Sequence, residues 1–258
     1  MIKTVRYNHG NTFSYAEYGE ENGRAILIQH GLIASIKDHH LFKRLIAMGL
    51  RLICIARPGY GKSSPYEMKN IAEWGDIVSV VVNELGLGRF DVFGISSGAP
   101  YSYAISYQLP DQVQNLFILS GTPALYDENV LSFWPYPMNK NASITKMQEL
   151  AYELFFSNLS QDDLNKEDIQ DSMMNHCFGI GQDFKLRCMD WGFPLSEVKG
   201  RVLMRHSRSD NSVPLVTAEM TAKLLLNCQL EIRENDDHFS QEVLDNFIDT
   251  IMKRYYIK

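Results

Sequence analysis

The chain has 258 residues, of which 45% are hydrophobic and 22% are charged, and its formal net charge is −6. This length and composition are typical of a soluble α/β protein that buries a substantial core, as one large domain or as a domain with an insertion. The acidic balance and the lack of a basic stripe argue against nucleic acid as a partner, and no apolar run is long enough to span a membrane.

The amino-terminal stretch MIKTVRYNHG lacks the apolar core of a secretory signal, so we expect a cytoplasmic protein. The adjacent His39 and His40 have no neighbours that would complete a metal-ligand set. The cysteines show no C-x-x-C spacing and mostly lie among apolar residues, which predicts reduced core thiols. They are Cys54, Cys177, Cys188 and Cys228. We therefore expect no disulfide, no metal and no cofactor.

The first half of the chain predicts a hairpin followed by alternating strands and helices. The stretches TVRY and TFSYAEYG flank His9-Gly10-Asn11, as the two strands of a β-hairpin would. Uninterrupted apolar runs, typical of strands buried on both faces, follow as AILIQ, RLICIA, FDVFG and VQNLFILS. Helical patterns separate them at about residues 37–48, 68–86 and 97–108. This alternation predicts an α/β fold with a mostly parallel central sheet and helices on both faces.

The strand-helix alternation is interrupted after Gly121-Thr122-Pro123. The stretch that follows is aromatic and helical, and in ITKMQELAYELFFSNL the apolar residues fall at helix spacing. Alternation resumes with GRVLMRH, a helix from about Pro214 to Leu226, QLEIRE, and a helix from about Gln241 to Tyr255. We predict a core domain of residues 1–122 and 197–258, with a helical cap inserted as residues 123–196.

The stretch GISSG, residues 94–98, joins the FDVF run directly to a helical pattern. Such a turn needs small residues where the strand and the helix press together, and Gly94 and Gly98 meet that need. The apex residue, Ser96, is then forced into a strained conformation that holds its side chain above the sheet. A G-x-S-x-G stretch also occurs by chance in loops, and it is this setting that favours a nucleophile.

A serine hydroxyl needs a neighbouring base to become a nucleophile, and in α/β sheets the active residues follow the carboxyl ends of strands. His30, His206 and His238 each follow a strand-like run. We take His238, after the last strand, as the base, and Asp210, in the neighbouring strand-end loop, as the acid that orients it. His30 is expected to be a structural hydrogen-bonding residue.

The oxyanion formed by attack on a carbonyl needs preorganised donors, and backbone amides serve because they need no reorganisation. We predict the amides of Ser97, at the start of a helix, and of Leu32, in the loop after AILIQ. Arg57 and Tyr60 are expected to shape the turn after the second central strand.

Seven motifs stand in the order in which α/β-hydrolase-fold proteins carry them, and the chain resembles that family over nearly its whole length. They are QHG, ARPGYGKSS from Ala56, GISSG, GAPYSYAISYQLPDQV, DWGFPL, SDNSVP and DHFS. The resemblance implies the same fold and a catalytic triad of Ser96, Asp210 and His238, in the family's order of nucleophile, acid and base. Some relatives place the acid earlier, where Asp127 stands.

The sequence departs from the family pattern in three places. Asp236 and Asp237 precede His238, where relatives commonly carry small residues, and they either influence the basicity of His238 or point to solvent. The acid loop HSRSD lacks a frequent glycine, and Ala56 replaces a usual acidic residue. Neither of the last two departures removes a member of the predicted triad.

The resemblance implies a serine hydrolase that works through an acyl-enzyme on a small or medium carboxylic ester. Relatives with this triad also act on peptide amino-terminal amides, thioesters, lactones or carbon–carbon bonds, or make peracids, and a non-catalytic ligand-binding protein is a further alternative. The expected partner is a small-molecule acyl substrate, and the sequence leaves open whether the chain forms a homo-oligomer. Aromatic candidates for the pocket wall are Phe133, Trp134, Tyr136, Phe155 and Trp191.

Overall fold

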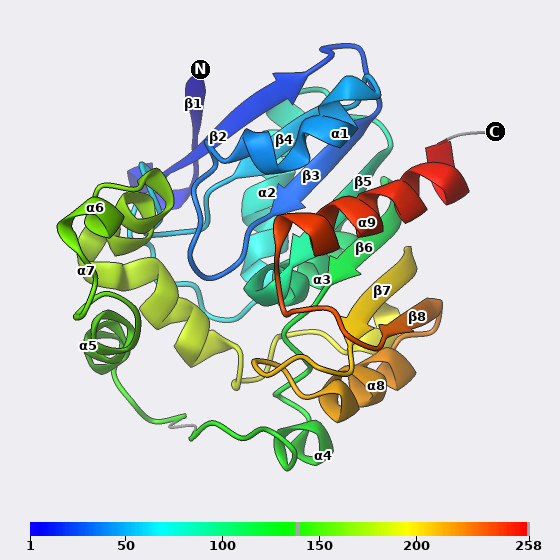
Figure 1. The fold of residues 1–258 in the computed structure, drawn as a ribbon. Coiled ribbons are helices and arrows are strands. Elements are labelled where there is room, and N and C mark those ends of the chain that lie inside the picture. Colours follow the sequence, from blue (N-terminus) through cyan, green and yellow to red (C-terminus); the bar gives the residue numbers. More distant parts are fainter. Residues whose placement is uncertain (138–139, 257–258) are drawn as a thin grey trace.

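The fold is built on one eight-stranded sheet, seen in a computed structural model that describes residues 1–137 and 140–256 (Figure 1). The spatial order of the strands is β1-β2-β4-β3-β5-β6-β7-β8. Their bounds are β1 (Ile2–Arg6), β2 (Thr12–Gly19), β3 (Ala25–Gln29), β4 (Arg51–Ile55), β5 (Phe90–Ile95), β6 (Val113–Leu119), β7 (Arg201–Ser207) and β8 (Cys228–Arg233).

The strand directions match the predicted hairpin and mostly parallel sheet. β1 pairs with β2 and β2 with β4 in antiparallel fashion, whereas every pairing from β4 through β8 is parallel. β3 and β5 lie side by side at the centre, and all their residues are buried. Their mostly apolar sequences follow from this, because helices cover both faces.

The helices of the described residues alternate with the strands and also fill the segment between β6 and β7. They are α1 (Lys43–Ala47), α2 (Ala72–Glu84), α3 (Ala99–Gln108), α4 (Glu128–Leu131), α5 (Ile144–Phe155), α6 (Gln161–Leu164), α7 (Glu167–Leu186), α8 (Leu215–Leu224) and α9 (Gln241–Ile251). Short 3₁₀ turns occupy Asn8–Gly10, His39–Phe42, Ser96–Gly98 and Leu195–Glu197, and Met252–Tyr256 forms a π-helical turn.

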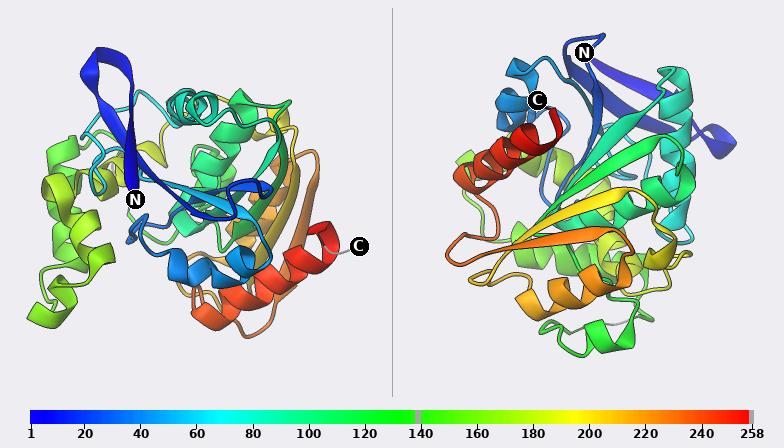
Figure 2. Two further views of the ribbon diagram at one scale, coloured as in Figure 1. Left: turned by 90° about the horizontal axis from the view of Figure 1, so that it is seen from above. Right: turned by 90° about the vertical axis from the view of Figure 1, so that its right-hand side faces the viewer.

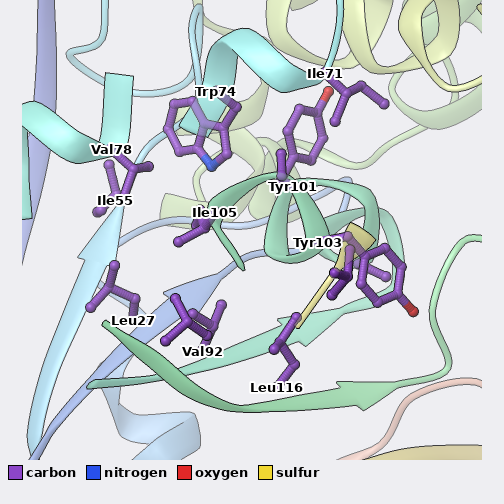
Figure 3. Packing of buried hydrophobic residues seen from close by; sticks show 14 of the residues in the cluster. Leu27, Ile55, Ile71, Trp74, Val78, Val92, Tyr101, Tyr103, Ile105 and Leu116 are labelled. Atoms are coloured by element: carbon purple, nitrogen blue, oxygen red, sulfur yellow. The ribbon is translucent and has the colours of Figure 1, made fainter. Parts of the chain in front are cut away.

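Two hydrophobic clusters hold the layers together, one on each face of the sheet. α2, α3 and α8 pack on one face, and α1 and α9 pack on the other (Figures 1 and 2). Successive strand residues point to opposite faces, so Leu27 joins the first cluster while its neighbour Ile28 joins the second. Figure 3 shows Trp74 and Tyr101 packed over strand residues such as Val92. Burying each large apolar side chain contributes about 1.5–3 kcal/mol.

Several helices are shorter than the sequence pattern predicts. The first, expected over about 37–48, begins with a 3₁₀ turn at His39, because Asp38 accepts the amide hydrogen of Ser35 and closes a turn before it. The helix expected over about 68–86 covers Ala72–Glu84. The last, expected as far as Tyr255, is α-helical only to Ile251 and ends in the π-helical turn.

The segment between β6 and β7 is helical, as predicted, and α5 and α7 pack against each other to one side of the sheet (Figure 1). Side chains of Asp127, Ser143 and Ser160 cap the amino termini of α4, α5 and α6. α7 is interrupted where residues 175–177 have φ of 53°, 58° and 59°, and the side chain of Gln148 donates to the carbonyls of Asn175 and His176 there. The boundaries 123–196 stay a prediction.

α7 is attached to the core by a buried ion pair. Arg57, in the turn after β4, donates to Asp183 of α7 over 2.7 Å, and these side chains are only 1% and 4% exposed. Burial alone would lower the pKa of Arg57, but the adjacent Asp183 carboxylate raises it above its usual value. The phenol of Tyr101 also donates to Asp183, over 2.5 Å. The pair therefore fixes the insertion to the carboxyl end of the sheet.

Within the described part of the chain, no helix combines the length and the apolar character that spanning a membrane requires.

Replacing Asp183 with Asn leaves the Arg57 guanidinium buried without its counter-charge, so we expect a loss of about 3–5 kcal/mol in the free energy of unfolding. Denaturant titration measures it. Glu234→Gln is the matched control, because it breaks the exposed Arg208–Glu234 pair, whose Nε and Oε2 atoms are 3.0 Å apart, and should cost less than about 1 kcal/mol. Equal losses in the two variants would show that burying Arg57 without its counter-charge does not destabilise the fold.

Candidate active site

Ser96 lies at the carboxyl end of β5 in a backbone conformation that few residues adopt. Its φ is 50°, and the turn Ser96–Gly98 leads straight into α3. A Cβ atom on Gly98 would lie 2.1 Å from the carbonyl oxygen of Gln29, and one on Gly94 would lie 2.3 Å from the Ser102 hydroxyl. Space therefore requires a glycine at 98, and it favours one at 94, where a Cβ would also lie 3.1 Å from the Gly98 carbonyl oxygen.

Three side chains from distant parts of the chain form one hydrogen-bonded row above β5. The Nε2 atom of His238 lies 2.9 Å from the Ser96 hydroxyl oxygen, and its Nδ1 atom lies 2.7 Å from Oδ2 of Asp210. An ionised carboxylate accepts, so Nδ1 donates to Asp210 and leaves Nε2 to accept the Ser96 proton. The structure thus brings together the three residues that the sequence predicts as nucleophile, base and acid.

The Asp210 carboxylate is held by donors on both of its oxygen atoms. Oδ1 accepts the amide hydrogens of Ser212 and Val213 over 2.8 and 2.9 Å, while Oδ2 faces His238. Burial alone would raise the pKa of Asp210, but the hydrogen bond from His238, its charge and the two amides together lower that pKa below its usual value. Asp210 is therefore ionised at neutral pH and suited to fix the tautomer of His238.

The loop after β3 brings Gly31, the residue before Leu32, close to Ser96. The carbonyls of His30 and Gly31 accept from the Arg57 guanidinium over 2.6 and 2.9 Å, and the Leu32 carbonyl accepts from the Tyr60 phenol over 2.9 Å. A Cβ on Gly31 would lie 3.9 Å from Cβ of Ser96. Leu32 and Ser97 both line the cavity that Ser96 faces. Their amides as oxyanion donors stay a prediction.

His30 has the structural role expected from the sequence. Its Nδ1 atom donates to the Gly31 carbonyl over 2.8 Å, and Nε2 accepts the Arg57 amide hydrogen over 3.3 Å. Burial, with the Arg57 charge beside it, holds the pKa of His30 well below its usual value, so the ring is neutral. It braces the start of the loop that carries Leu32.

Ser96 and His238 open onto a cavity of about 1100 Å³. The wall is mostly apolar and is formed by the segment after β3, the β5 turn, the helical insertion and the His238 loop. Three of the predicted wall residues, Trp134, Tyr136 and Phe155, lie on it. A cavity of this size and character accommodates a small organic molecule.

Two of the predicted pocket residues lie elsewhere. Trp191 is fully buried in the core against Tyr126 and Phe193, and its indole nitrogen donates to the Arg187 carbonyl. Phe133 is 52% exposed and lies off the cavity wall. The prediction was wrong for both, because an aromatic residue in a helical insertion packs equally well in the core, on the cavity or at the surface.

The alternative candidates have other positions. Asp127 accepts the amide hydrogens of Asn129 and Val130 as the cap of α4, not as a partner of His238. Oδ2 of Asp236 lies 3.6 Å from Nε of Arg233, and the side chain of Asp237 is exposed to solvent. His206 is buried under the acid loop, and its Nε2 atom donates to the Val213 carbonyl.

Sequence reasoning missed two charged residues near the site. Asp183 anchors Arg57 and thereby the Leu32 loop, and Arg187 lies on the cavity wall with its guanidinium over the Phe184 ring, 4.5 Å from the centroid. Both belong to an ordinary helical pattern, so no local motif could have singled them out. Among the residues that the structure describes, no three His, Cys, Asp or Glu side chains are arranged to hold a metal ion.

Gly98→Ala forces a Cβ into the Gln29 carbonyl, so we expect it to lower the free energy of unfolding by about 2–3 kcal/mol or more and to displace Ser96. Gly88→Ala is the matched control, since nothing lies within 4 Å of its Cβ position. It should change stability by no more than about 1 kcal/mol. Thermal unfolding measures both, and a Gly98→Ala protein as stable as Gly88→Ala would contradict the close packing of this turn.

Comparison with known proteins shows the family to which the chain belongs. Residues 24–243 match the family model of the alpha/beta hydrolase fold. An uncharacterized hydrolase of Bacillus subtilis strain 168, YcgS, is 27% identical over 120 residues, which are 46% of this chain and 41% of that one. A 2-hydroxy-6-oxononadienedioate/2-hydroxy-6-oxononatrienedioate hydrolase of Pseudomonas putida is 24% identical, with 95% of this chain and 93% of that one covered.

Among solved structures, an esterase from Exiguobacterium antarcticum superposes with a TM-score of 0.75 at 19% identity, covering 98% of this chain and 99% of that one. The family match spans most of the chain and includes all three residues of the hydrogen-bonded row. The chain is thus a hydrolase that belongs to the alpha/beta hydrolase fold family.

Proposed function

We propose that this hydrolase cleaves a small or medium carboxylic ester through an acyl-enzyme on Ser96. The observation that carries the proposal is the hydrogen-bonded row of Ser96, His238 and Asp210 at the wall of a mostly apolar cavity. The structural similarity to an esterase supports it.

In the proposed reaction, Ser96 Oγ attacks the ester carbonyl while Nε2 of His238 takes its proton, a step that general-base catalysis accelerates by about 10²–10⁴. The oxyanion is met by the amides of Leu32 and Ser97, each worth about 10²–10³ in rate. His238 then gives its proton to the departing alcohol, and water releases the acid from Ser96 by the same route. Asp210 stabilises the imidazolium form of His238 in both halves.

We propose residues 123–196 as the cap over this site. Trp134, Tyr136 and Phe155 of this segment lie on the cavity wall, and the Tyr136 phenol donates to the Asn211 carbonyl in the loop that carries Asp210. A cap in this position excludes water from the acyl-enzyme and supplies apolar contacts to the substrate.

A second candidate function is cleavage of a carbon–carbon bond beside a ketone. The Pseudomonas putida relative is named for a dicarboxylate that carries a ketone and no ester, and it covers nearly the whole chain. Arg187, a cation on the cavity wall, suits a carboxylate of such a compound. The ratio of kcat/KM for 2-hydroxy-6-oxononadienedioate to that for p-nitrophenyl butyrate separates the two. We expect a ratio below one, and a ratio far above one would favour the second function.

Ser96→Ala removes the proposed nucleophile, so kcat/KM for p-nitrophenyl butyrate should fall by about 10⁴-fold or more. A fluorophosphonate probe should label the natural protein on Ser96 and leave the variant unlabelled. Ser79→Ala, a serine-to-alanine change on α2 away from the cavity, is the matched control and should keep both properties. Turnover that survives in Ser96→Ala would overturn the assignment, and a protein with neither labelling nor turnover would support a ligand-binding role.

A further inference from the structure

The cavity extends to both sides of Ser96 along the sheet. β5, which carries Ser96, has β3 and then β4 on one side and β6, β7 and β8 on the other. Asp210 and His238 come from the loops after β7 and β8, so the proton-transfer machinery occupies the second side only. The cavity wall nevertheless includes strand residues from β3 and β4, which lie on the first side.

The strand residues that line the cavity on the β3 and β4 side are apolar and adjacent to one another. Ile28 and Cys54 are directly opposite each other in the β3–β4 pairing, and Ile28 is opposite Phe93, two residues before Ile95. Because strand residues alternate, Ile28, Cys54 and Ile95 all point to the face that α1 and α9 cover. The segment from β3 to α1 closes this part of the cavity. We call this part of the cavity the acyl arm. The residues that line it are Ile28, Ile36, Leu41, Phe42, Cys54 and Ile95.

The strand residues of the acyl arm are uncharged, although the Asp38 carboxylate at the rim contributes, after burial, to raising the pKa of the Cys54 thiol. Burial raises the pKa of the Cys54 thiol to about 12, so the thiol is neutral and behaves as a small apolar group. The charged residues that also line the cavity on this side belong to two surface segments, 37–40 and 166–168, where the side chains are half-buried or exposed. The arm is therefore apolar inside and charged at its rim.

The direction of proton transfer determines on which side of Ser96 the acyl part and the alcohol part of an ester lie. Ser96 Oγ bonds to the carbonyl carbon, the bond from that carbon to the alcohol oxygen breaks, and His238 delivers the Ser96 proton to this oxygen. The alcohol must therefore lie within reach of His238, on the side of β6 to β8. The acyl chain, on the opposite side of the carbonyl carbon, then extends toward β3 and β4.

We propose that the acyl arm binds an aliphatic acyl chain, so that the substrates are esters of medium-chain carboxylic acids. This inference rests on the proposed ester hydrolysis at Ser96. Each methylene that enters the arm should raise kcat/KM by about fourfold, which corresponds to about 0.8 kcal/mol of burial. Cys54, at the strand floor of the arm, then determines specificity for chain length.

The test is the ratio of kcat/KM for p-nitrophenyl octanoate to that for p-nitrophenyl acetate. Cys54→Phe fills the floor of the arm and should lower this ratio by about tenfold or more, since at least two methylenes lose their place. Cys54→Ala, which leaves the arm open, should not lower it. Cys228→Phe is the matched control, because this strand cysteine of β8 lies off the cavity, and its ratio should equal that of the natural protein.

Leu41→Trp provides a second way to narrow the arm if Cys54→Phe does not fold, because Leu41 is only partly buried and tolerates a larger side chain. Circular dichroism and thermal unfolding report the folding of each variant. In a matched series of alkyl acetates, where only the alcohol lengthens, the relative rates should be the same in the narrowed variants and in the natural protein.

The acyl-arm proposal would be overturned if the folded, narrowed variants had the same ratio of kcat/KM for octanoate to kcat/KM for acetate as the natural protein. It would also be overturned if only the relative rates for the alkyl acetates changed, because this result would place the alcohol on the β3 and β4 side. In both results the natural protein hydrolyses esters, and the proposed function stands. If the natural protein hydrolyses no ester and takes no fluorophosphonate label, the proposed function fails, and the acyl arm falls with it.

Discussion

The close approach of the turn between β5 and α3 to the end of β3 is the constraint on which the rest of the site depends. This turn leaves no room for a side chain at Gly98, whose Cβ would meet the Gln29 carbonyl, and it holds Ser96 at a φ of 50°. Strain of this kind costs about 1–3 kcal/mol and persists only because the packed layers on both faces impose it. The gain is a hydroxyl fixed above the sheet, where loops from β7 and β8 bring Asp210 and His238 to it.

A second set of contacts links the helical insertion to the same edge of the sheet. Arg57 binds Asp183 of α7 and, with the same guanidinium, the carbonyls of His30 and Gly31. The loop that carries Leu32 is therefore braced from the side of the insertion as well as from the sheet. Such a buried pair contributes little net stability compared with apolar packing, so its value here is in fixing one arrangement of loop and insertion. Substrate contacts from the insertion then have a defined position relative to Ser96.

Most of the fold and the row of Ser96, His238 and Asp210 could be predicted from the sequence, because short contiguous patterns determine them. A buried strand, a glycine-flanked turn or a strand-end histidine is visible within ten residues. Arg57 and Asp183 are 126 positions apart and neither stands in a charged motif, so their pairing could not be foreseen. Trp191 was misplaced in the pocket because its burial against Tyr126 and Phe193 depends on how the segment before β7 packs, which the local pattern does not encode. The acyl arm could not be predicted either, because it depends on the order and register of the strands.

The proposed mechanism requires that Ser96 becomes covalently acylated while His238 accepts the proton of its hydroxyl group. Rapid acid quenching during turnover of a p-nitrophenyl ester, followed by mass spectrometry of the intact protein and its peptides, tests it most directly. We expect the peptide that contains Ser96 to gain the mass of one acyl group in the natural protein and to gain none when His238 is replaced by alanine. Two results would rule out acylation of Ser96. One is an acyl group on any other residue, and the other is a burst of p-nitrophenol with no acyl group on the protein.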